Sequence, residues 1–272
     1  DHLTPAVVLG SFLSESYKNG KDKLTLIIPK KFEDFGLWVE QLIAESTGKE
    51  GKGIVPVIDT KIYDPSSYQN DRCFVIVTLK NYFENEEQIN ELIKNCFPVS
   101  RIYLDDIYDI GKEFYRWEIA TAITGYIMRI NPFDQPDVEF TKEFTRKILK
   151  KGKPKTKPEI KTKNESVYLA NLKINKDEQL MWQILKNVEP EGYLAICAYI
   201  TENENTVKEL ENIKNLITSL TSTTTLCVFG PRYLHSIGQL FKGGKNNGTF
   251  IILTSEPKKG IKILRDGIDF KK

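Results

Sequence analysis

Short apolar runs alternate with longer amphipathic segments along most of the chain. The short runs are rich in Val, Ile and Leu, as buried parallel strands are, whereas the longer segments place apolar residues at helical spacing. This alternation predicts an α/β fold with a mostly parallel sheet, in which ligands bind beyond the carboxyl ends of the strands. The predicted strands are 24–28, 54–58, 73–79, 99–104, 193–200, 224–229, 249–254 and 261–264, and the predicted helices are 4–18, 35–49, 85–95, 111–130, 134–150, 206–220 and 231–241.

The helix predicted over 35–49 has one apolar side and a polar border. Asp34 is placed to cap its start, and Gly48 to end it, because Gly tolerates the left-handed conformation of many helix exits. Gln41 and Glu45 are four residues apart and therefore neighbours on one face. A carboxylate at this border is half desolvated, which tends to raise its pKa toward that of a usable base; the alternative is an ordinary solvated residue. The apolar side consists of Phe35, Trp38, Val39, Leu42 and Ile43.

Two other segments lead to specific expectations. Apolar residues occur nearly all round the helix predicted over 111–130, which predicts a central, buried helix. Arg116 and Glu118 are the charged exceptions in this helix. They are expected to form either a buried pair or charges at the rim of the helix. Pro56, inside the strand predicted over 54–58, indicates an edge strand or a strand end.

Composition narrows the class of protein. The 272 residues suffice for a real core, and 40% hydrophobic and 28% charged residues are ordinary for a globular protein. A net charge of +2 gives no reason to expect binding to nucleic acid or to a membrane. The basic stretch 150–163 contains two prolines but no arginine or aromatic residue, so it reads as a mobile linker. With no signal peptide and no C-x-x-C pair, we expect a cytoplasmic protein; its start at Asp1 suggests a fragment or a processed piece.

Two stretches carry a resemblance to a known family. Gln41-x-x-x-Glu45-Ser46-x-Gly48-Lys49 resembles the sequence around the catalytic glutamate of glucose-6-phosphate isomerases. The stretch 131–142, NPFDQPDVEFTK, is similar to that family's second signature, N-x-F-D-Q-x-x-V-E-x-x-K, and follows the first in the family's order. With GPRYLHSIGQLFKGG near the end, the chain looks closer still to the isomerase portion of bacterial transaldolase–isomerase fusions.

The resemblance implies a fold, a domain plan and partners. The fold would be the sugar-isomerase (SIS) α/β three-layer sandwich. Residues 1–150 would form an SIS-like domain with both signatures, 151–165 a Lys-rich linker, and 166–272 an α/β continuation with His235. The substrates would be glucose 6-phosphate and fructose 6-phosphate, with no cofactor and no metal. A homodimer is implied by the family.

The resemblance also implies roles for individual residues. Glu45 would move a proton next to the carbonyl, through an enediolate, and His235 with Lys142 would open the hexose ring. In ordinary members that histidine lies between the two signatures, whereas His235 follows both, as in the fused branch. Gln135 and Lys142 would share one face of a helix whose free N–H groups favour anions. The other substrate-binding residues would be Gln41, Lys49, Arg232 and Lys242.

Departures from the family pattern leave alternatives open. The family's G-G-R-x-S motif and its Ser/Thr-rich phosphate loops are missing from the sequence. Arg232 is the candidate substitute for the arginine of that motif. The simplest interpretation is the C-terminal part of a longer isomerase, with an incomplete site. One alternative is a non-catalytic sugar-phosphate-binding module. Another is a docking half with an exposed apolar patch. Transaldolase activity is not expected, because no eight-fold strand–helix barrel is visible.

Overall fold

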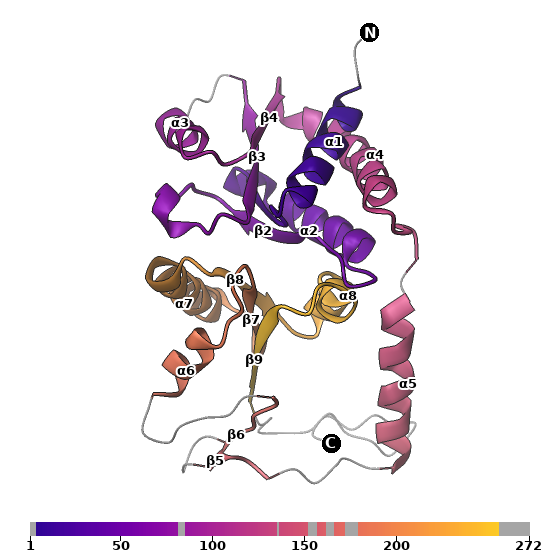
Figure 1. Ribbon diagram of the computed structural model, residues 1–272, viewed down its shortest axis with the longest axis vertical. Helices are drawn as coiled ribbons and strands as arrows, with labels where there is room; N and C mark the ends of the chain where they lie inside the picture. The colour runs from indigo at the N-terminus through magenta and orange to yellow at the C-terminus, as the bar shows by residue number, and fades with distance from the viewer. Residues whose placement is uncertain are drawn as a thin grey trace.

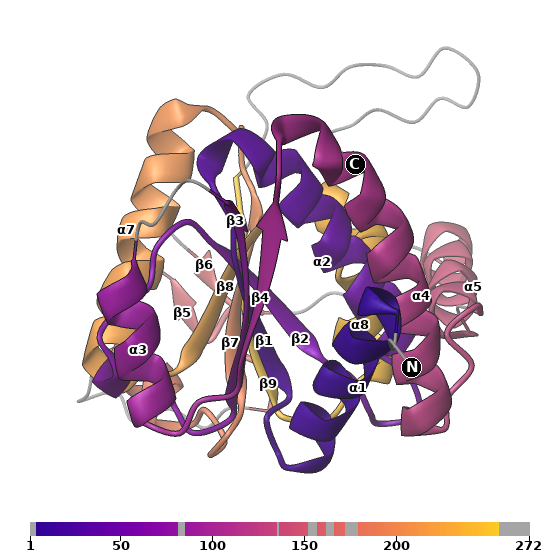
Figure 2. The same cartoon turned by 90° about the horizontal axis from the view of Figure 1, so that it is seen from above.

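The chain folds into three layers, with helices on both faces of a central layer of parallel strands (Figures 1 and 2). The computed structural model describes residues 4–80, 85–134, 136–151, 157–161, 166–171 and 179–255. This arrangement confirms the predicted α/β sandwich. None of the helices in these ranges has both the length and the apolar character needed to cross a bilayer.

The first sheet holds the four strands of the N-terminal part in the order β2-β1-β3-β4, all parallel. Pro56 lies in β2, an edge strand of this sheet, where its missing N–H leaves few ladder bonds unmade. The prediction of an edge position for this strand is therefore confirmed. The strands are β1 (Lys23–Ile27), β2 (Val55–Asp59), β3 (Arg72–Leu79) and β4 (Val99–Leu104).

The second sheet holds three parallel strands, with β7 between β8 and β9. A two-residue antiparallel pair, β5 and β6, is separate from it. The strand predicted over 261–264 lies outside the described residues. The strands are β5 (Ile160–Lys161), β6 (Ser166–Val167), β7 (Tyr193–Tyr199), β8 (Thr224–Phe229) and β9 (Gly248–Thr254).

The helices divide between the two faces of the strand layer, as Figure 2 shows. Helices α3 (Glu86–Lys94) and α7 (Glu204–Thr221) cover one face. Four others cover the opposite face, and α5 stands beside them. The short helix α6 (Leu180–Lys186) was not predicted. The four are α1 (Pro5–Lys18), α2 (Glu33–Thr47), α4 (Ile110–Met128) and α8 (Gly238–Gly243), and α5 spans Pro136–Lys151.

The two sheets share a hydrophobic cluster and several polar contacts. Val57 of the edge strand β2 packs in one cluster with Ala195 of β7. Lys23, which is fully buried, donates from Nζ to the carbonyl oxygen of Glu191, 2.7 Å away and just before β7. These contacts place the carboxyl-terminal sheet directly beside the amino-terminal one, so elements far apart in sequence can share one site.

Helix α4 contradicts the prediction of all-round burial. Trp117 is fully buried, but Tyr115 and Tyr126 are 68% and 83% exposed, because α4 packs on α1 and α2 with one side only. Arg116 and Glu118 lie at the rim of the buried side of α4, which is one of the two predicted alternatives. Arg116 lies 3.3 Å from Glu113, one helical turn earlier, whereas Glu118 is exposed.

Helix α2 starts earlier than predicted. A turn of 3-10 helix, Lys30–Phe32, leads into it, and Phe32 occupies the N-cap position. Asp34 lies inside the first turn, where its negative charge interacts favourably with the positive end of the helix dipole. Its side chain does not cap a backbone N–H. The predicted cap was therefore wrong, although the helix and its buried side were correct.

Candidate functional site

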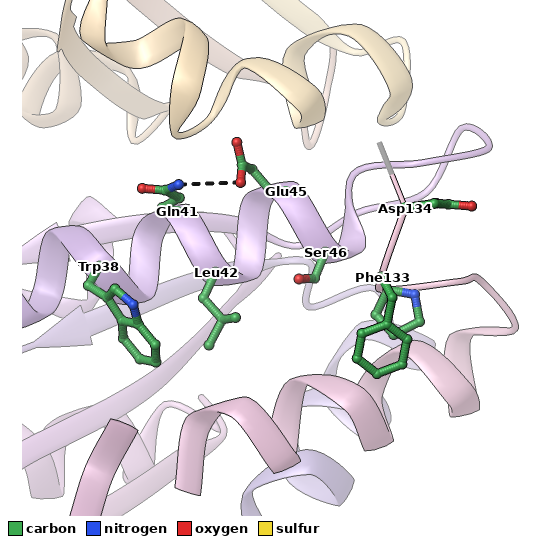
Figure 3. A pocket seen from close by; sticks show the side chains of 8 residues that line it. Trp38, Gln41, Leu42, Glu45, Ser46, Phe133 and Asp134 are labelled. Carbon is green, nitrogen blue, oxygen red and sulfur yellow. Dashed lines mark hydrogen bonds between the residues drawn. The ribbon is translucent and has the colours of Figure 1, made fainter. Parts of the chain in front are cut away.

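The second half of α2 presents the predicted pair of polar side chains. Gln41 Nε2 donates to Glu45 Oε2 at 3.4 Å, a long hydrogen bond across one helical turn. Glu45 is half-buried and Gln41 is exposed, so the carboxylate is partly shielded from water, as predicted. Figure 3 shows both side chains on the side of α2 that faces the C-terminal elements, opposite Trp38 and Leu42.

A pocket of about 200 Å³ lies between α2 and the loop that follows α4. Typical small-ligand sites enclose about 300–1,000 Å³. The pocket is therefore smaller than a typical small-ligand site. The pocket is lined by Trp38, Gln41, Leu42, Glu45 and Ser46 from α2 and by Pro132, Phe133 and Asp134 from the loop.

Aromatic rings support one wall of the pocket. The Trp38 ring lies 4.6 Å from that of Phe114 on α4, and Phe35 meets Phe114 edge to face at 5.0 Å. Stacked and edge-to-face pairs of this kind add to the burial energy of the rings, so they fix the position of the Trp38 indole. On the loop side, Phe133 is 84% exposed.

Lys49 fastens the pocket loop to the end of α2. Its side chain is buried, and Nζ donates to the Asn131 carbonyl at 2.7 Å, to the Asp134 carbonyl, and to Asp134 Oδ1 at 3.0 Å. The loop also ties itself together, since Asn131 Nδ2 donates to Asp134 Oδ2 at 3.0 Å. The nearby ammonium lowers the pKa of Asp134. The side chain predicted to bind substrate is thus committed to the loop.

We expect Lys49→Met to destabilise the fold by about 2 kcal/mol, because hydrogen bonds made by a charged donor each contribute more than neutral ones. Methionine keeps the buried length of the side chain but leaves two carbonyl groups without their donor. Urea unfolding measures the change. The control is Lys94→Met, since Lys94 is a lysine with 70% of its side chain exposed. Equal stability of the two variants would contradict the fastening role.

Gly48 ends α2 for a reason other than the one predicted. Its φ is −76°, so no left-handed conformation is involved. A Cβ at this position would instead lie 2.3 Å from the Leu240 Cα of α8. Gln239 Nε2 donates to the Gly48 carbonyl at 2.9 Å, and Gly51 N donates to the Gly243 carbonyl at 2.9 Å. Gly48 is therefore the residue that allows α8 to approach the backbone of α2.

The remaining predicted residues lie on elements around this junction. His235 and Arg232 are exposed on the 3-10 turn η4 (Arg232–His235), which follows the carboxyl end of β8 and precedes α8. This confirms the predicted strand-to-helix turn. Lys242 is exposed on α8, and Lys142 is exposed on α5, which contacts α8. Gln135 lies outside the described residues.

Only two of the predicted residues, Gln41 and Glu45, line the pocket in the part of the chain that the structure describes. Sequence reasoning placed Trp38 on the apolar side of α2; Trp38 and Asp134 both line the pocket. Sequence reasoning also gave no role to Glu40. The position of Glu40 one turn before Ala44, on the same face of α2, was the feature that could have indicated a buried acidic side chain.

Comparison with known proteins gives partial matches. No family model matches the chain. A probable glucose-6-phosphate isomerase of Methanococcus maripaludis is 28% identical over 174 residues, covering 51% of this chain and 40% of that protein. The glucose-6-phosphate isomerase of Methanocaldococcus jannaschii is 28% identical over 174 residues (51% and 43%), and that of Clostridium tetani 31% over 147 residues (40% and 33%). The matches thus span between a third and about two fifths of the length of these curated relatives.

Proposed function

We propose that this chain carries part of the active site of a glucose-6-phosphate isomerase, with Glu45 as the base. The observation that carries the proposal is the Gln41–Glu45 pair on the wall of a partly enclosed pocket. The names of the relatives supply the reaction, isomerisation of glucose 6-phosphate, and we propose fructose 6-phosphate as its product. A half-buried carboxylate that accepts a hydrogen bond from a neighbouring amide suits a group that must be oriented to remove a substrate proton.

The proposed reaction moves one proton from C-2 to C-1 and a second between the two oxygens, with no net change in oxidation state. In the open-chain aldose, the Glu45 carboxylate removes the proton from C-2, and the electron pair of that bond forms the C-1–C-2 double bond of an enediolate. The former carbonyl oxygen takes the negative charge. Glu45 then returns the proton to C-1, while the proton of the C-2 hydroxyl passes to the C-1 oxygen and the C-2 oxygen becomes the new carbonyl. The Gln41 amide orients the carboxylate through its hydrogen bond to Oε2.

The other predicted residues keep their proposed roles, with one change. His235, with Lys142, opens the hexose ring, since an imidazole can carry protons near neutrality. Gln135, Arg232 and Lys242 bind the sugar phosphate. Lys49 holds the pocket loop and does not contact the substrate, because its ammonium already serves that loop. Its effect on binding is therefore indirect.

The proposal includes further protein outside this chain. The pocket is small for a hexose phosphate, and the matches span about two fifths of the relatives. The missing phosphate loops and the enediolate arginine would then come from an N-terminal part of a longer isomerase. A preceding transaldolase, a homodimer and a cytoplasmic location belong to the same proposal. The domain plan is residues 1–150, a linker over 151–165, and 166–272.

Isomerase turnover tests the proposal. Fructose 6-phosphate is supplied to this chain and to the chain extended at its amino terminus, and glucose 6-phosphate is detected with a coupled dehydrogenase. Turnover in the extended form alone supports the shared site. Turnover in neither form, with fructose 6-phosphate still bound in calorimetry, would overturn the enzyme and favour the second candidate, a sugar-phosphate-binding module. The small open pocket is the observation that favours that candidate.

A further inference from the structure

One face of α2 packs on the segment that carries His235. The face consists of residues one turn apart, Glu40, Ala44 and Gly48. Ala44 belongs to the hydrophobic cluster that contains Tyr233 of η4. Together with the close approach at Gly48, this makes the contact continuous from the middle of α2 to its end.

Glu40 is the acidic residue on this packed face. It is only 7% exposed, and its Oε1 has no hydrogen-bond partner among the described residues. Burial raises the pKa of Glu40, while the Arg232 charge and the Ser236 hydroxyl oppose that rise. Ser236 is buried too. Native folds satisfy most buried polar groups, so the buried Glu40 carboxylate calls for an explanation.

The two groups that act on Glu40 stand at the two ends of the η4 turn. Arg232 is its first residue, and Ser236 directly follows His235. The Glu40 carboxylate therefore faces the turn at Arg232 and Ser236, and His235 lies between these two residues. Because Glu40 is next to Gln41, the helix that presents Glu45 also packs against the histidine turn.

We infer that Glu40 is a positioning residue, which fixes the η4 turn and thereby the His235 imidazole relative to Glu45. The inference rests on the proposed isomerase function, since only ring opening gives the position of His235 a kinetic consequence. Glu40 makes no contact with substrate in this scheme. It lies outside the residues that line the pocket.

The test combines a spectroscopic and a kinetic readout of Glu40→Gln in the full chain. His2 and His235 are the two histidines of the sequence, so their imidazole NMR resonances are easily told apart with a His235→Gln reference. We expect the substitution to move the His235 resonance and leave that of His2 in place. In the form that turns over, kcat should fall about 100-fold at nearly constant KM, as expected for a misplaced catalytic group. A purely structural role would lower the unfolding temperature without this split.

Control variants distinguish a failure of the Glu40 inference from a failure of the proposed isomerase function. Glu33→Gln changes an exposed acid on the same helix and should alter neither readout. If Glu40→Gln fails to fold, Ser236→Ala carries the same expectation. An unchanged His235 resonance and an unchanged kcat would overturn the inference, even if Glu45 proves essential. Absence of turnover in every form would overturn the isomerase, while the NMR comparison would still report whether Glu40 holds the turn.

Discussion

Replacing Glu45 with Gln is expected to reduce isomerase turnover about 1,000-fold, within the range that general bases contribute. Glutamine keeps the size of the side chain and can still pair with the Gln41 amide, but it cannot accept the substrate proton. Binding of fructose 6-phosphate should stay within about threefold, because the neutral side chain leaves the pocket shape unchanged. Steady-state kinetics and calorimetry on the form that turns over give the two numbers.

The matched control for this prediction is Glu50→Gln. Glu50 is an exposed acid just beyond α2, so its charge is close to the site but does not line the pocket. Its removal should leave kcat within about twofold, as is usual for surface substitutions. Equal loss of binding and turnover in Glu45→Gln would assign Glu45 to the structure of the pocket. Full activity of that variant would remove it from the reaction.

A single methyl group at Gly48 is expected to destabilise the protein by about 3 kcal/mol, at the upper end of typical overpacking costs. A Cβ there would meet the Leu240 Cα at 2.3 Å and the Ala44 carbonyl oxygen at 2.7 Å. Both are backbone atoms, which cannot move aside as a flexible side chain can. The Gly48→Ala variant must therefore separate α8 from α2, and turnover should fall together with stability.

Gly111→Ala is the control for Gly48→Ala. Gly111 lies in α4, and nothing stands within 4 Å of a Cβ built there. Alanine is a better helix former, so this variant should be more stable than the parent by about 0.5–1 kcal/mol. Urea unfolding of the two variants compares the same substitution in a crowded and in an open place. A Gly48→Ala variant as stable as Gly111→Ala would show that the helices part without cost.

Regular spacing explains which parts of the fold could be predicted. The strand at 99–104 was predicted with its observed bounds, and Pro56 gave the edge position of β2, because both depend on local chemistry. The burial of α4 could not be obtained in that way. Tyr115 and Tyr126 fit a buried helix as well as an exposed one, and only the packing of α1 and α2 against one side decides between them.

The site was predicted only as far as it is local to α2. Gln41 and Glu45 follow from helical spacing and from their motif. The commitment of Lys49 to Asn131 and Asp134 depends on a contact across more than eighty positions of sequence, which a pattern of spacing does not contain. Gly48 was correctly predicted to end α2, but the physical reason for a glycine at this position was not predicted. A glycine needed for close approach looks the same in a sequence as one needed for a left-handed turn.

The contact between Gln239 and Gly48 joins residues that are 191 positions apart. At typical synthesis rates of 5–20 residues per second, α2 leaves the ribosome about ten to forty seconds before α8 can reach it. During that interval the Ala44 face of α2 has no partner, and the acid at position 40 remains in water. The candidate site is consequently assembled late in the synthesis of the chain. Chaperones that bind exposed apolar helices would meet this helix before α8 does.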